Sequence, residues 1–313
     1  MPRTDFYRHA PTGTVSSVGI GSYLGPLDDA RDESYTAAVQ AAIAGGINFI
    51  DTSLNYRNQR SERAIGRALA GHRRQELVLC TKAGYLVPDA VPTAVLRAGD
   101  VVAGMHSMAP AFLRDQLERS LANLGVDAVD VFYLHNPETQ LAHIGEEDFY
   151  QRCRLAFECL EKLAAARLIR YYGAATWNGF RDGQLSLPRL AAIAQEISGQ
   201  SHRFRFIQLP VNLAMPEALT RGVLAQAAEH GITAIASASL LQARLAQDLP
   251  AGLAAKFPGL TTDAQRALQF TRSTPGVTVA LVGMGQVAHV AQNLAVAEVP
   301  PLTEAEYTGL FNG

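Results

Sequence analysis

The chain has 313 residues, of which 48% are hydrophobic and 18% are charged. This composition excludes a disordered or collagen-like chain and supplies enough apolar material for a large core. With 27 basic and 29 acidic residues, the net charge of −2 gives no general attraction to nucleic acid or to an anionic membrane. No apolar run reaches the roughly 18–20 residues of a membrane helix. We therefore expect neither a nucleic-acid partner nor a membrane partner.

The beginning of the chain and its cysteines point to a reducing compartment. Residues 1–6 start no apolar segment of the kind that signal peptides contain. Cys80, Cys153 and Cys159 are too few for a disulfide framework and lack the spacing of a zinc site. We expect a cytoplasmic protein without a metal site, with Cys153 and Cys159 packed in one helix.

Eight short apolar segments alternate with eight helix-like segments. The predicted strands are residues 18–21, 47–50, 77–81, 129–134, 169–174, 206–209, 233–236 and 277–282. The predicted helices are residues 33–44, 61–70, 111–124, 149–166, 187–197, 216–230, 262–272 and 287–297. Because parallel neighbouring strands need a crossover and a helix supplies it, this succession predicts a parallel sheet.

The number of units favours a closed barrel. Eight strand–helix units in a chain of this length predict an α/β fold of the (β/α)8 TIM-barrel type, which we assign to residues 1–313 as a single domain. An open doubly wound sheet is the structural alternative. The glycines after the first strand, Gly19 and Gly21, lack the third glycine of a dinucleotide-binding loop, which disfavours that alternative. The residues before Val18 fit a short strand or plug at the floor of a barrel.

Three predicted strands end in reactive side chains. Asp51, Lys82 and His135 lie at the ends of the second, third and fourth strands, and Tyr56 follows Asp51 by five residues. In a barrel all four converge on the carboxyl-terminal face. Taken singly, each is more often a cap, a turn residue or a solvated charge than a functional group. Together they suit carbonyl reduction, because an ammonium lowers the pKa of a nearby phenol and a neutral imidazole orients a carbonyl oxygen.

One connection is unusually long and runs from Lys82 to the helix that begins near Pro110. Long loops in compact domains are often functional, and a loop after a barrel strand lies on the face that carries the site. We therefore expect this loop to shape a substrate pocket. The expected pocket walls are Tyr23, Trp177 and, from the loop, Met105, His106 and Met108.

Two segments around Asp51 and Tyr56 resemble the sequence of a known protein family. Residues 46–56, Gly-Ile-Asn-Phe-Ile-Asp-Thr-Ser-Leu-Asn-Tyr, and residues 61–69, Ser-Glu-Arg-Ala-Ile-Gly-Arg-Ala-Leu, are similar to the signature of the aldo-keto reductases. The resemblance implies a TIM barrel, a nicotinamide cofactor bound without a Rossmann domain, and a catalytic tetrad. The implied tetrad is Asp51, Tyr56, Lys82 and His135. The implied substrate contacts are Tyr23, Tyr56, His135 and Trp177.

The resemblance also implies a cofactor cleft. Gly21, Ser22 and Tyr23 match the loop at the nicotinamide and ribose, Gln208 matches a carboxamide ligand, and Asn293 matches an adenine ligand. The implied cofactor contacts as a whole are Gly21, Ser22, Tyr23, Asp51, Thr176, Gln208, Ser237, Leu240, Gln242, Gly283, Met284, Gly285, His289 and Asn293.

Several of these positions depart from the family pattern. Ala175 and Thr176 replace the usual serine and asparagine at the carboxamide, and Ser237 replaces an aromatic residue under the nicotinamide, a role that Trp177 could take over. Gly283 and His289 replace the lysine and arginine that usually bind the 2′-phosphate, and neither carries a fixed charge. NADP(H) is the cofactor that the resemblance implies, with NAD(H) as a competitor. Arg244 and Arg272 are candidates to replace the missing cations at the 2′-phosphate. The alternative interpretation, which we favour, is that both are ordinary surface residues.

The leading hypothesis is an NAD(P)H-dependent oxidoreductase that reduces an aldehyde or ketone to an alcohol, or runs the reverse, with Tyr56 as proton donor. A second hypothesis is a cofactor-binding regulatory subunit that resembles the β-subunits of potassium channels. A third is a nicotinamide-dependent elimination or epimerisation without net redox change. Substrate, physiological direction and oligomeric state stay open at this stage.

Overall fold

Eight parallel strands form the centre of the protein in the computed structural model, which describes residues 2–311. They are β3 (Val18–Gly21), β4 (Phe49–Asp51), β5 (Val78–Ala83), β8 (Val129–His135), β9 (Ile169–Ala175), β10 (Phe204–Pro210), β11 (Thr233–Ser237) and β12 (Val277–Gly283). They pair in the order β10–β11–β12–β3–β4–β5–β8–β9, and β9 pairs with β10 to close the ring. This closure confirms the predicted TIM barrel and excludes the open sheet.

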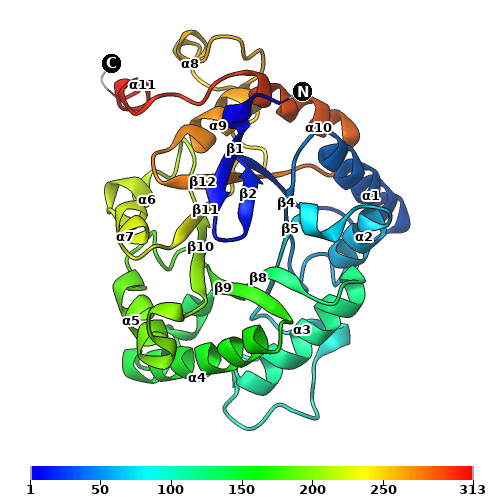
Figure 1. Ribbon diagram of the computed structural model, residues 1–313, viewed down its shortest axis with the longest axis vertical. Helices are drawn as coiled ribbons and strands as arrows, with labels where there is room; N and C mark the ends of the chain where they lie inside the picture. The colour runs from blue at the N-terminus through cyan, green and yellow to red at the C-terminus, as the bar shows by residue number, and fades with distance from the viewer. Residues whose placement is uncertain (1, 312–313) are drawn as a thin grey trace.

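Helices surround this barrel as an outer ring (Figure 1). They are α1 (Asp29–Ala44), α2 (Arg60–Leu69), α3 (Pro110–Leu124), α4 (Glu146–Ala165), α5 (Leu187–Ser198), α6 (Glu217–Thr220), α7 (Val223–Glu229), α8 (Gly252–Lys256), α9 (Asp263–Ser273), α10 (Val287–Leu294) and α11 (Glu304–Gly309). Helix α1 begins four residues before its predicted start, because the Asp28 carboxylate accepts a hydrogen bond from the Arg31 backbone N–H and caps the helix there.

Two predicted helices are interrupted in the structure. The segment 216–230 is broken into α6 and α7, because Gly222 takes a left-handed conformation with φ of +72° that interrupts the helix. The segment 287–297 is α-helical only to Leu294 and continues as a 3₁₀ turn, Ala295–Glu298. Both breaks are local, and the helices still cover the strands beside them.

A hairpin closes the amino end of the barrel. Strands β1 (Tyr7–Ala10) and β2 (Gly13–Ser16) pair in antiparallel and lie across the middle of the ring in Figure 1. The Arg8 guanidinium donates to the carbonyl oxygen of Val277 at 2.6 Å, where β12 begins. This hairpin corresponds to the short strand or plug expected before Val18. Because it covers the amino end of the barrel, the carboxyl ends of the strands remain open to a ligand.

Arg272 belongs to the same closed end. Its side chain is fully buried, donates to Ser17 Oγ at 3.0 Å, and also hydrogen-bonds Gln269. The prediction that Arg272 is a surface residue or a phosphate ligand is therefore wrong. Its guanidinium hydrogen-bonds Gln269 on α9 and Ser17, just before β3, and is buried between them.

Three further features concern membrane, thiol and metal chemistry. Within residues 2–311, no helix combines the length and apolar character needed to cross a membrane. Cys80, Cys153 and Cys159 are free thiols in the core, the latter two on α4 as expected. Over the same described range, no three His, Cys, Asp or Glu side chains gather where they could hold a metal ion.

Candidate active site

A cavity of about 790 Å³ opens at the carboxyl ends of the barrel strands. Most of the predicted site residues line it: Gly21, Ser22, Tyr23, Asp51, Tyr56, His135, Thr176, Trp177, Gln208, Ser237, Leu240, Gln242, Gly283, Gly285, His289 and Asn293. Two of the implied catalytic and cofactor residues do not. Lys82 lies just beneath the lining, and the Met284 side chain packs in the hydrophobic core, so it offers no side-chain contact to a ligand.

Asp51, Lys82 and Tyr56 form one hydrogen-bonded group. Asp51 ends β4, Lys82 lies near the end of the neighbouring β5, and Tyr56 lies in the loop after β4. Lys82 Nζ donates to Asp51 Oδ2 at 2.6 Å and to the Thr52 carbonyl oxygen at 2.8 Å, and lies 3.5 Å from the Tyr56 hydroxyl. Because adjacent parallel strands end at one edge, three residues spread over 32 positions of sequence meet here.

Burial controls the charges of this group. Burial alone would lower the pKa of Lys82, but Asp51 and Tyr56 raise it, and the net pKa lies above its usual range. Lys82 therefore stays protonated. Burial also raises the pKa of Tyr56, and Lys82 opposes that increase only in part. Lys82 lowers the pKa of Tyr56, as expected from the sequence, but the net shift is upward because the phenol is removed from water.

His135 ends β8 and its ring packs edge-on against that of Tyr56, with centroids 5.7 Å apart. Its Nδ1 lies 3.1 Å from Ser53 Oγ. Burial, with the Lys82 charge as a smaller contribution, holds the pKa of His135 well below its usual value. The imidazole is thus neutral. Ser53 Oγ also lies 2.6 Å from Asn55 Oδ1, so its contact with Nδ1 does not by itself set the tautomer, and the tautomer with its proton on Nε2 is the one that can donate to a substrate oxygen.

His106, in the long loop after β5, hydrogen-bonds the backbone of His135 and is itself held by Gln140 and Arg152. Arg152 donates to Gln140 Oε1 at 3.0 Å, and Gln140 Nε2 lies 3.2 Å from His106 Nδ1. His106 Nε2 lies 2.8 Å from the carbonyl oxygen of His135. In this series of hydrogen bonds Arg152 donates to Gln140, Gln140 to His106 and His106 to His135. The series requires a neutral His106 with its proton on Nε2.

The loop shapes the cavity differently from the prediction. Among its described residues, Tyr85 lines the cavity, whereas Met105, His106 and Met108 do not. Met108 is in the core, Met105 faces outward, and His106 is buried under Tyr85, with ring centroids 5.2 Å apart. The methionines were thus incorrect as pocket walls, because the short hairpin of β6 (Val101–Val102) and β7 (His106–Ser107) turns them away.

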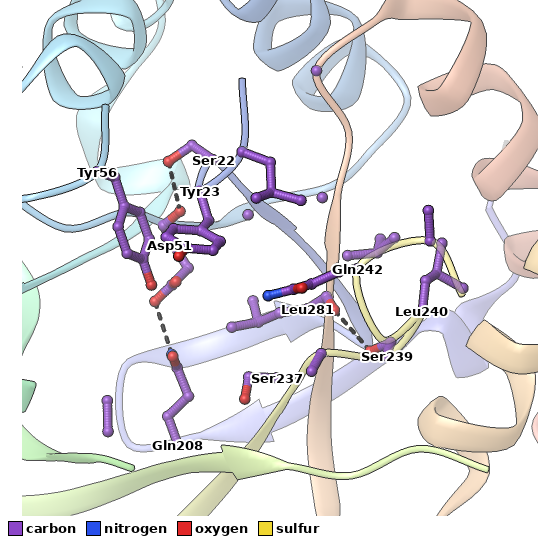
Figure 2. A pocket seen from close by; sticks show the side chains of 18 of the residues that line it. Ser22, Tyr23, Asp51, Tyr56, Gln208, Ser237, Ser239, Leu240, Gln242 and Leu281 are labelled. Atoms are coloured by element: carbon purple, nitrogen blue, oxygen red, sulfur yellow. Dashed lines mark hydrogen bonds between the residues drawn. The ribbon is translucent and has the colours of Figure 1, made fainter. Parts of the chain in front are cut away.

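Gln208, Thr176 and Trp177 form another side of the cavity. Gln208 Nε2 donates to Asp51 Oδ1 at 2.8 Å, a contact that Figure 2 shows below Tyr56. The Glu138 carboxylate accepts from the Trp177 backbone N–H at 2.8 Å and so fixes the loop after β9. The Trp177 side chain lines the cavity and remains 38% exposed, so whether it supports a nicotinamide ring remains a prediction.

Opposite this group, the loop after β11 curls around the cavity (Figure 2). Ser239 Oγ donates to the Leu281 carbonyl oxygen at 2.7 Å and ties the loop to β12. Ala238, Leu241, Gln242 and Ala243 all have positive φ, between 45° and 69°. Because such conformations are unfavourable for residues other than glycine, they are typical of loops shaped around a ligand.

Two buried polar atoms at the cavity have no hydrogen-bond partner within the protein. Thr176 Oγ1 and Asn293 Oδ1 are buried without a hydrogen-bond partner, and both residues line the cavity. A buried polar atom without a partner is unfavourable, so both atoms are available to hydrogen-bond a group that enters the cavity. Their positions are those that the sequence assigned to the carboxamide and the adenine.

The cavity is also lined by residues that were not predicted from the sequence, among them Leu24, Arg31, Tyr35, Asn55, Tyr85, Asn136, Ser239 and Gln292. Asn136 directly follows His135 and Asn55 directly precedes Tyr56, so their positions beside predicted catalytic residues were a usable signal. Arg31 and Tyr35 lie on α1, and no local sequence pattern distinguishes them from the other residues of that helix.

Comparisons with known proteins identify the family of the chain. The aldo/keto reductase family model matches residues 17–249. The Bacillus subtilis (strain 168) protein named "Uncharacterized oxidoreductase YqkF" is 25% identical over 313 residues, covering 95% of this chain and 92% of that protein. The D-threo-aldose 1-dehydrogenase of a Pseudomonas species is 28% identical over 171 residues, covering 52% of this chain and 49% of that protein.

Solved structures add agreement in fold. A Klebsiella pneumoniae aldo/keto reductase, crystallised with NADP and acetate, matches with a TM-score of 0.73 and 23% identity, covering 99% of this chain and 95% of that chain. Since the family model spans well over half of the sequence and the barrel is the same, the chain belongs to the aldo/keto reductase family and is an oxidoreductase.

Proposed function

We propose that this protein transfers hydride between NADP(H) and a small aldehyde or ketone, or the corresponding alcohol. The observation that carries the proposal is the 3.5 Å contact between the Tyr56 hydroxyl and the buried Lys82 ammonium, at one end of a 790 Å³ cavity. A protonated phenol held beside a cation is a proton donor ready for carbonyl reduction. The presence of NADP in the Klebsiella protein of the same fold supports this choice of cofactor.

The residues that would hold the dinucleotide are distributed along the cavity. Thr176 and Gln208 would bind the carboxamide, and the 237–242 loop would enclose the pyrophosphate. Gly283, Gly285, His289 and Asn293 would enclose the adenosine half. When bound, the reduced nicotinamide supplies a hydride to the carbonyl carbon of the substrate.

The chain supplies the proton and the orientation. His135 Nε2–H donates a hydrogen bond to the carbonyl oxygen and places it near the Tyr56 hydroxyl. As negative charge develops on that oxygen, Tyr56 transfers its proton to it, and the resulting phenolate is stabilised by the Lys82 ammonium. Water then returns a proton to Tyr56. In the reverse direction, the phenolate accepts the alcohol proton.

Asp51 has a positioning role in this scheme. Its two carboxylate oxygens accept from Lys82 and Gln208, so one residue holds the ammonium under Tyr56 and the amide at the carboxamide site. A buried carboxylate with both oxygens occupied is also a fixed counter-charge, which keeps Lys82 protonated when water is excluded.

The direct test is incubation of the protein with NADPH deuterated at the transferred position and a panel of aldehydes and ketones. We expect loss of reduced nicotinamide in equal amount to alcohol formed, with deuterium on the former carbonyl carbon. Cofactor binding without turnover of any carbonyl would favour a regulatory subunit instead. Conversion of an alcohol or sugar substrate without net change in the cofactor would favour elimination or epimerisation.

A further inference from the structure

The cavity has one fixed positive charge within its described lining. Among the residues that line it, Arg31 is the only lysine or arginine. The two positions that the family resemblance assigns to 2′-phosphate binding, Gly283 and His289, carry no fixed charge. Arg244, a substitute suggested by the sequence, is exposed and does not line the cavity.

Arg31 extends from α1 to the loop that follows β12. Its Nη1 lies 3.4 Å from the Gly285 carbonyl oxygen, its Nη2 lies 3.5 Å from the Leu24 carbonyl oxygen, and its guanidinium stacks 4.7 Å above the Tyr35 ring. Both hydrogen bonds are at the long limit of such contacts. Arg31 Nε is buried and has no partner. The guanidinium therefore keeps unused donor capacity beside the cavity.

The charge of Arg31 is also uncompensated. Three arginines nearby pair with Asp32: Arg57 Nη2 lies 2.6 Å from Oδ1, Arg60 Nη2 lies 2.8 Å from Oδ2, and Arg67 Nη2 lies 3.8 Å from Oδ2. In the described part of the chain, no carboxylate lies within ion-pair distance of the Arg31 guanidinium. A cation that is stacked, partly desolvated and without a counter-ion is a site for an anion.

The backbone around Arg31 makes room for its guanidinium. A Cβ at Gly285 would collide with the Arg31 guanidinium, and a Cβ at Gly25 would lie 2.5 Å from Nε. Ser34 Oγ donates to the Gly285 carbonyl oxygen at 2.6 Å and fixes the loop under the guanidinium. Glycine at both positions therefore permits Arg31 to reach this end of the cavity.

We propose that Arg31 binds the 2′-phosphate of NADP(H) and gives the protein its preference for NADP(H) over NAD(H). This inference rests on the proposed function. It assigns Arg31 to the 2′-phosphate rather than the pyrophosphate because Arg31 contacts Gly285, within the segment expected to enclose the adenosine half. The planar guanidinium presents two parallel donors that match the oxygens of a phosphate.

The test compares two ligands that differ only in the 2′-phosphate. Calorimetric titrations with 2′,5′-ADP and 5′-AMP are made on the wild type, Arg31→Gln, Arg31→Lys and the matched control Arg244→Gln, each checked for an unchanged melting temperature. We expect Arg31→Gln to weaken 2′,5′-ADP binding by about 10- to 100-fold and 5′-AMP binding by less than about threefold. Arg31→Lys falls between, and Arg244→Gln resembles the wild type.

The proposal is overturned if Arg31→Gln weakens both ligands equally, or neither, or if Arg244→Gln produces the larger loss. Titrations of the wild type with NADPH and NADH separate this failure from failure of the proposed function. Binding of both dinucleotides with equal affinity rejects only the role of Arg31. Binding of neither dinucleotide rejects the proposed function as well.

Discussion

The buried His106 should make the protein sensitive to acid in a defined pH range. Burial lowers the pKa of His106 from 6.5 to about 4. The geometry gives the reason, since His106 Nδ1 faces the Gln140 amide while Nε2 serves the His135 carbonyl oxygen. A second proton would remove the acceptor on Nδ1 and bury a charge among neutral groups.

The size of the effect follows from the two pKa values. The unfolded chain binds a proton on this histidine near pH 6.5, and the folded chain binds it only near pH 4. Stability therefore falls as the pH is lowered through this range and is unaffected above it. At about 1.4 kcal/mol per pKa unit, His106 should account for a loss of about 2 kcal/mol between pH 8 and pH 5.

Urea denaturation at pH 8 and pH 5 measures this loss for the wild type and for His106→Gln. At pH 8 the variant should be less stable by about 1 kcal/mol, since a hydrogen bond to the His135 carbonyl is weakened. At pH 5 the difference should be reversed, because glutamine does not titrate. The exposed His72→Gln is the control and should follow the wild type. Parallel pH dependence in the wild type and His106→Gln would refute the reasoning.

Two further predictions concern the groups around Tyr56. Ser53→Ala should remove the partner of His135 Nδ1, lowering kcat/KM about five- to tenfold with an unchanged Kd for NADPH, and nitrogen NMR of the His135 ring should show the wild-type proton on Nε2; a wild-type proton on Nδ1 would contradict this. Lys82→Met should destabilise the protein by about 3–5 kcal/mol in urea denaturation, because it leaves the buried Asp51 charge unpaired. Adding Asp51→Asn to Lys82→Met should recover most of the lost free energy of unfolding. A double variant no more stable than Lys82→Met would refute the pairing of Lys82 with Asp51.

The sequence predicted the parts of the site that depend on strand order. Asp51, Lys82 and His135 each follow an apolar segment, and parallel strands place such ends on one face, so their convergence could be inferred without contacts. The barrel could be predicted for the same reason, from eight repeats of one local pattern. Helix breaks such as that at Gly222 could not, because they arise from a single backbone conformation.

Long side chains and long loops were harder to predict. The position of Arg31 on α1 gives no indication that its guanidinium stacks on Tyr35 and reaches Gly285. The roles of His106 and the methionines in the loop after β5 depend on a short hairpin that turns some side chains inward and others outward. Arg272 is a charged residue near a helix end, and only the packed structure shows that it is buried at the amino end of the barrel.

The most direct test of the central claim, that Tyr56 donates the proton, is a single-turnover measurement of NADPH oxidation by Tyr56→Phe. We expect a rate at least about 100-fold below that of the wild type, with NADPH affinity unchanged within about twofold. Tyr23→Phe is the matched control, since the ring of Tyr23 lies 4.9 Å from that of Tyr56 and should retain most of the rate without its hydroxyl. A Tyr56→Phe variant that oxidises bound NADPH at nearly the wild-type rate would contradict the account.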